Sequence, residues 1–156
     1  MHAIRLRRPW HAQWCPNGVQ PPVATAAGLT SPNQLPTSSI SLRTACYRRA
    51  FNRPTGLIPG QVVAIVLREV VMKVEETEET EETENRRGAS GYVGCQAIRL
   101  NSQLLVLDDM EDRIEIDIGQ QLEAFNQLEI FCQLLACTAA EPPELTDFME
   151  ISIAIY

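Results

Sequence analysis

An acidic triplet repeat divides this chain and restricts what can pack around it. Glu-Glu-Thr occurs three times in succession, and seven of the ten residues from Glu75 to Glu84 are glutamate. On a helix, like charges three and four residues apart repel, and no face of this segment is apolar. We therefore expect an acidic loop or linker over residues 75–91 that stays in solvent and takes no part in a core.

Charge is distributed unevenly around this repeat. Residues 1–68 contain eight arginines and no acid, which gives a net charge of +8. Residues 69–156 contain all 20 acids and five basic residues, which gives −15 and a total of −7. Such asymmetry predicts a basic arm or targeting segment joined to an acidic body.

The N-terminal region has the composition of a disordered segment. Residues 1–39 hold six prolines and show no apolar periodicity, so they are predicted to remain a disordered basic arm rich in Pro and Ser. Residues 40–53 are compatible with a short helix that Ser41 caps and Pro54 ends. The expected division is an arm over 1–39 and a single domain over 40–156, interrupted by the acidic loop.

Several segments of that domain are predicted to be strands. Residues 61–74 fit a strand or a helix, and we favour the strand because a helix would run its negative C-terminal end into Glu75 and Glu76. Residues 92–107 indicate strand, turn and strand around Asn101. Residues 113–118 alternate strictly, with isoleucine on one face and charge on the other, which is typical of a half-buried strand.

A helix is expected near the C-terminus. Six apolar residues recur at helical spacing, which predicts one principal helix over about 120–137: Leu122, Phe125, Leu128, Phe131, Cys132 and Leu135. Residues 148–156 then alternate as a terminal strand. The fold class indicated is α+β, with a small, mostly antiparallel sheet and this helix packed on it.

The five cysteines indicate free thiols. Their number is odd and no secretory signal precedes them, so we expect an intracellular, reducing compartment. Cys132 and Cys137 would lie about 140° apart on the predicted helix and would not bridge. No apolar run reaches the roughly 18–20 residues of a membrane-spanning helix.

Arginines and aromatic residues alternate in the first third of the chain, which is typical of a segment that contacts an anionic surface or nucleic acid. The candidate anion-contacting residues are Arg5, Arg7, Arg8, Arg43, Arg48, Arg49 and Arg53. The same composition is typical of a cleaved transit segment for organelle import. The protein is otherwise expected in the cytoplasm.

The glutamates of the repeat are candidate contacts to a basic partner surface or to the chain's own arginines. They are Glu75, Glu76, Glu78, Glu79, Glu81, Glu82 and Glu84. A zinc pair at His11 and Cys15 lacks the further ligands that a structural site needs. The carboxylates between Asp108 and Asp117 lack the spacing of a calcium loop. No catalytic, cofactor-binding or metal-binding residue is assigned.

These patterns favour a non-enzymatic protein-interaction module with a flexible basic arm and an acidic body. An unidentified protein partner is expected. One alternative is an accessory protein that binds nucleic acid through the arginine-rich arm. Another is an open reading frame without a settled function.

Overall fold

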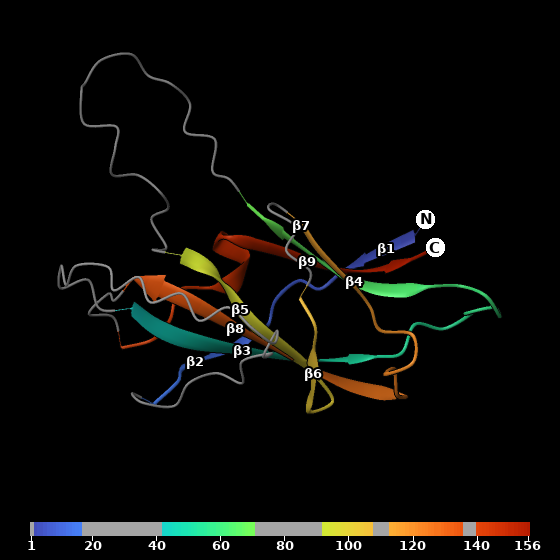
Figure 1. Ribbon diagram of the computed structural model, residues 1–156, viewed down its shortest axis with the longest axis horizontal. Helices are drawn as coiled ribbons and strands as arrows, with labels where there is room; N and C mark the ends of the chain where they lie inside the picture. The colour runs from blue at the N-terminus through green and yellow to red at the C-terminus, as the bar shows by residue number, and fades with distance from the viewer. Residues whose placement is uncertain (1, 17–41, 71–91, 108–112, 136–139) are drawn as a thin grey trace, which may run out of the picture.

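The chain forms two antiparallel β-sheets that stack face to face, and the computed structural model describes residues 2–16, 42–70, 92–107, 113–135 and 140–156. Figure 1 shows sheet A above sheet B. Sheet A has the strand order β1-β9-β4-β7, and sheet B has the order β2-β3-β8-β5-β6. The strands are β1 (His2–Arg5), β2 (His11–Trp14), β3 (Leu42–Asn52), β4 (Val63–Glu69), β5 (Tyr92–Leu100), β6 (Gln103–Leu105), β7 (Arg113–Asp117), β8 (Phe125–Leu135) and β9 (Met149–Ile155), with a short 3-10 turn η2 (Leu145–Asp147).

The centre of sheet A is built from β4 and β9. Ile65 and Leu67 of β4 face Ile153 and Ile151 of β9 in register, and all four side chains are buried in the main core. Successive residues of a strand point to opposite faces, so the intervening residues lie on the outer face of the sheet. Burial of each such aliphatic side chain contributes about 1.5–3 kcal/mol.

The centre of sheet B is β8, which pairs with β3 along eleven residues and with β5 on its other side. Every second side chain of β8 enters the core between the sheets. These are Leu128, Ile130, Cys132 and Leu134, and each is fully buried. The sandwich core is therefore formed by the inner faces of two sheets, as expected for stacked sheets about 10 Å apart.

The predicted helix over about 120–137 is wrong, because residues 125–135 are strand β8. Ile130 and Leu134 sit on what would be the polar side of that helix, and with Leu128 they follow the period of two. The outer face of β8 is also partly apolar, since Phe131 packs there against Cys46. Apolar residues on both faces of a central strand obscure the alternation, so the α+β class is replaced by an all-β sandwich.

The predicted disordered region is wrong for residues 2–16. Strand β1 pairs with β9 in sheet A, and β2 pairs with β3 in sheet B. The short helix expected over 40–53 is wrong as well, since residues 42–52 form β3. Residues 17–41 lie outside the described part, and with them the expected boundary at residue 39.

Other expectations are confirmed. Residues 63–69 form a strand, and β5 and β6 flank a turn in which Asn101 and Ser102 have φ of 50° and 69°. In β7 the isoleucines pack on the core while Glu115 and Asp117 are exposed. The acidic repeat lies outside the described residues. Within the described ranges, no helix has both the length and the apolar character needed to cross a membrane.

Candidate binding site

The outer face of sheet A carries a shallow depression of about 140 Å³. We call it the sheet A depression. Val66 and Ala154 form a small, buried apolar floor. The polar side chains around this floor come from four strands and the C-terminal residue, and they are Arg5, Arg68, Arg113, Glu150, Ser152 and Tyr156.

The strand register brings two arginines together in this depression. Arg68 of β4 lies directly opposite Arg113 of β7, and opposite Glu150 of β9 on its other side. Side chains directly opposite on neighbouring strands are in contact range, and like charges at such positions are destabilising. The Arg68–Arg113 contact is therefore unfavourable taken alone, whereas Glu150 opposite Arg68 and Glu115 beside Arg113 offset it in part.

Two of the three arginines have acidic partners. The Arg5 Nε lies 2.9 Å from a Glu150 carboxylate oxygen. Arg113 forms an ion pair with Glu115 and donates a hydrogen bond of 3.1 Å to the Tyr156 hydroxyl oxygen. A hydrogen bond to Glu115 raises the pKa of Tyr156.

Arg68 differs from its neighbours. Its side chain is exposed, and no carboxylate among the described residues lies within ion-pair distance of it. The Nε of Arg113 is buried without an acceptor among the same residues. Guanidinium groups present fixed forks of donors that match carboxylate or phosphate oxygens. The depression is thus suited to hold an anionic group beside Arg68.

The outer face of sheet B carries a different arrangement, in which the charges are already paired. Glu129 of β8 is 8% exposed and lies between Arg48 of β3 and Arg99 of β5. Its two carboxylate oxygens are 2.8 Å and 2.9 Å from the Nε atoms of Arg48 and Arg99. Arg99 also lies over the Phe131 ring, 5.0 Å from its centroid. We call Arg48, Arg99 and Glu129 the sheet B triad.

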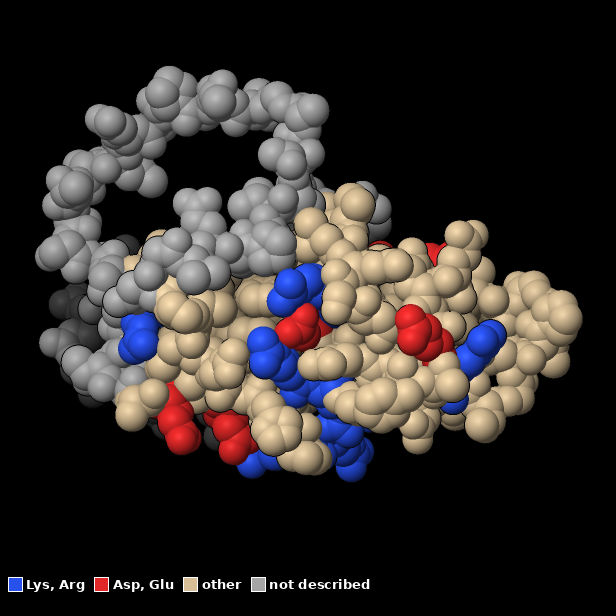
Figure 2. Space-filling model, turned by 90° about the horizontal axis from the view of Figure 1, so that it is seen from below, with Lys and Arg blue, Asp and Glu red and all other residues tan. Residues whose placement is uncertain are grey.

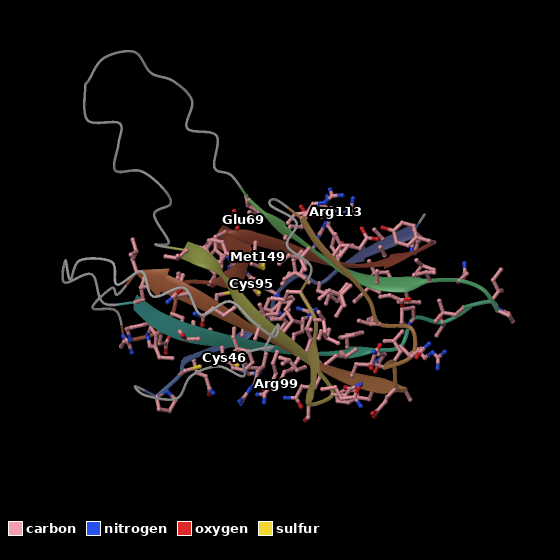
Figure 3. The ribbon with its side chains drawn as sticks, viewed as in Figure 1. Cys46, Glu69, Cys95, Arg99, Arg113 and Met149 are labelled. Atoms are coloured by element: carbon pink, nitrogen blue, oxygen red, sulfur yellow. The ribbon has the colours of Figure 1, made fainter. Side chains whose placement is uncertain are left out.

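Figure 2 shows the molecule from below, where sheet B lies. Basic side chains gather near the centre of this view, and an acidic group lies among them. Figure 3 places Arg99 and Arg113 on opposite sides of the molecule. The two candidate surfaces are therefore separate.

The seven arginines predicted to contact an anion do not form one surface. Arg5 belongs to the sheet A depression and Arg48 to the sheet B triad. The other five lie elsewhere. Arg8 pairs with Glu144 at 2.5 Å and Asp147 at 3.6 Å. In β3, Arg43 lies 4.0 Å from the Trp14 ring centroid, and Arg49 lies 5.8 Å from that of Trp10 and donates to the Pro9 carbonyl. Arg7 and Arg53 are exposed.

Sequence reasoning missed Arg68, Ser152 and Tyr156 as members of a site. Strict alternation placed Arg113 on the outer face of its strand, but the register that sets Arg68 against it is not readable from the sequence. The glutamates from Glu75 to Glu84 lie outside the described residues. His11 lies in β2 and Cys15 directly follows that strand. The described residues contain no group of three His, Cys, Asp or Glu side chains placed to hold a metal ion.

No family model matches the chain, and no curated protein matches it. The fold is similar to part of an FMN-binding beta-glucuronidase from Facaelibacterium prausnitzii L2-6, with a TM-score of 0.50 and 14% sequence identity. The similarity covers 97% of this chain and 22% of that protein's chain. That neighbour is named as an enzyme, and at this identity the likeness concerns the fold alone.

Proposed function

We propose that this chain is a non-enzymatic protein-interaction module that binds an acidic segment of a partner protein in the sheet A depression. The observation that carries the proposal is the placement of Arg68 opposite Arg113, with no carboxylate paired to Arg68 among the described residues. As in the sequence-based hypothesis, arginines make the contact with an anionic group. The proposed contact surface is now a face of sheet A instead of an N-terminal arm.

A carboxylate from the partner would convert a repulsive contact into an attractive one. Placed between two guanidinium groups, it would accept charge-assisted hydrogen bonds, and the exposure of Arg68 limits its contribution to about 1 kcal/mol. The small floor at Val66 and Ala154 leaves room for an acidic side chain to approach the arginines. Arg5 already holds Glu150, so Arg68 supplies the charge that remains for the partner.

Nucleic-acid association through the arginines is the second candidate. The basic side chains near the centre of Figure 2 favour it. In that case the contact would be made by the sheet B triad and its surroundings, because Arg48 and Arg99 lie on that face. The sheet A proposal ranks first because both arginines of the triad already share the buried Glu129.

The test is a titration of the full chain with a fluorescent acidic decapeptide rich in glutamate, followed by anisotropy. Arg68→Gln should weaken peptide binding by about fivefold, since it removes an exposed charge-assisted contact worth about 1 kcal/mol. Arg53→Gln is the matched control, because Arg53 is an exposed arginine outside the depression. The proposal fails if both variants bind the peptide like the unmodified chain, or if single-stranded DNA competes and only Arg48→Gln or Arg99→Gln reduces binding.

A further inference from the structure

Two cysteines face each other inside sheet B. Cys95 of β5 is directly opposite Cys132 of β8 in the antiparallel register. Both belong to the inner side of the sheet, where Cys132 is part of the main core and Cys95 packs against it. Figure 3 shows Cys95 between the two sheets, away from Cys46 on the lower face.

The register brings the two backbones close enough for a disulfide. Directly paired residues of antiparallel strands have Cα atoms about 4.5–5.5 Å apart, which falls inside the roughly 4.4–6.8 Å that disulfides span. Their Cβ atoms are about 4.5–5.5 Å apart, so a bond requires them to approach by about 1 Å. A register shift between Cys95 and Ala97 interrupts the ladder beside the pair, and such a bulge lets the strand adjust.

The two thiols differ in access to solvent. Cys132 is fully buried, whereas Cys95 is half-buried. Burial, together with a hydrogen bond to the Cys95 thiol, raises the pKa of Cys132 well above its ordinary value. Cys95 is therefore the thiol that a reagent in solution reaches first, and Cys132 is the thiol that reacts second.

We propose that Cys95 and Cys132 form a reversible dithiol–disulfide pair that a low-molecular-weight disulfide such as oxidised glutathione can oxidise. The Cys95 thiolate attacks one sulfur of the small disulfide, which forms a mixed disulfide and releases one thiol. The Cys132 thiolate then attacks the Cys95 sulfur, which forms the Cys95–Cys132 bond and releases the second thiol. Two protein thiols are oxidised, the small disulfide is reduced to two thiols, and the two protein protons end on those thiols.

The bond would join two neighbouring strands of sheet B near one end of the sandwich. At that end Tyr92 of β5 stacks on Phe148, with ring centroids 4.7 Å apart. Closing the chain between residues 95 and 132 restricts the unfolded state. Oxidation is thus expected to raise the melting temperature, and this effect is independent of peptide binding in the sheet A depression.

The experiment incubates the full chain in mixtures of reduced and oxidised glutathione, quenches the thiols by acid and alkylation, and maps peptides by mass spectrometry. The expected result is a Cys95–Cys132 cross-link that reduction reverses, with a melting temperature raised by about 5 °C or more. Cys95→Ser should abolish both effects, whereas Cys46→Ser should leave the cross-link intact. Cys132→Ala serves as a second variant in which Cys95 ends as a glutathione adduct.

Three outcomes would overturn the proposal. One is stable glutathionylation of Cys95 in the unmodified chain without closure to Cys132. Another is a dominant cross-link between other cysteines, such as Cys15 with Cys46. The third is a cross-link that forms only in denaturant, because that would show that the folded register does not bring the sulfurs together.

Discussion

Arg68 and Arg113 lie directly opposite each other on β4 and β7, on the outer face of sheet A. Glu150 lies on the other side of Arg68 and is held by Arg5 at 2.9 Å. Among the residues that the structure describes, Arg68 has no ion-pair partner. The proposed binding of an acidic partner depends on this placement. Substitution of Arg68 is therefore expected to affect peptide binding more than the stability of the fold.

Arg68→Gln is expected to leave the fold intact or slightly more stable while it weakens acidic-peptide binding. Removal of one of two like charges relieves a repulsion of at most about 1 kcal/mol. Urea unfolding measures this change, and Arg53→Gln serves as the comparison. A loss of more than about 1 kcal/mol would mean that Arg68 supports the sheet through contacts of its own.

Glu129→Gln should destabilise the protein clearly. The substitution removes the largely buried carboxylate with which both Arg48 and Arg99 form ion pairs. Breaking a fully buried ion pair costs about 3–5 kcal/mol. The partial exposure of both arginines, at 42% and 30% of their side chains, reduces the expected loss to about 1–3 kcal/mol. Glu150→Gln, at the more exposed Arg5 pair, should cost less than about 1 kcal/mol. Equal effects in chemical denaturation would contradict the structural role of the sheet B triad.

Stability is expected to fall as pH rises above about 9. Burial raises the pKa of Cys15, Cys46 and Cys132 from the ordinary value of 9.0. Arg48 opposes the shift at Cys46, whereas Glu129 adds to it, and Glu69 and Cys95 add to that of Cys132. Above pH 9 the unfolded chain therefore holds fewer protons than the folded chain, so the free energy of unfolding decreases with pH.

This stability contribution is fully present below pH 9 and is lost as pH rises through the folded-state pKa values. Urea midpoints between pH 7 and pH 10 under reducing conditions measure it. Cys46→Ser should flatten the slope. A midpoint that rises over this range would contradict the assigned direction.

Leu128 and Leu135 distinguish strand β8 from the helix that the sequence suggested. On a helix, residues seven apart share a face, so truncating either would have a similar effect. In β8, Leu128 is fully buried and Leu135 is 41% exposed. We expect Leu128→Ala to cost about 2–5 kcal/mol and Leu135→Ala less than about 1 kcal/mol, measured by thermal or urea unfolding. Similar losses would favour the helix.

The sequence was most informative where one face of a strand is buried in the core and the other is exposed to solvent. The isoleucines of β7 and β9 alternate with polar or small residues, and both strands form as predicted. Strand β8 was misread because Phe131 packs on the outer face while Ile130 and Cys132 fill the inner one. Apolar side chains on both faces of a central strand mimic a helical stripe over eleven residues.

The candidate site could be foreseen only in part. Arg5 was selected because of its charge, and Arg113 was placed on an exposed face by alternation. Their proximity to Arg68 depends on pairing between strands that are far apart in the sequence, and no local pattern encodes that register. The N-terminal strands were missed because β1 and β2 are four residues each and gain their stability from β9 and β3.

Side-chain NMR of the arginine Nε–Hε groups distinguishes binding in the sheet A depression from binding at the sheet B triad. The full chain is titrated with the acidic decapeptide at low salt and again at physiological salt. Binding in the sheet A depression should shift the signals of Arg68 and Arg113 and leave those of Arg48 and Arg99 in place, and the shifts should shrink as salt rises. Shifts confined to Arg48 and Arg99, with Arg68 unmoved at peptide saturation, would contradict it.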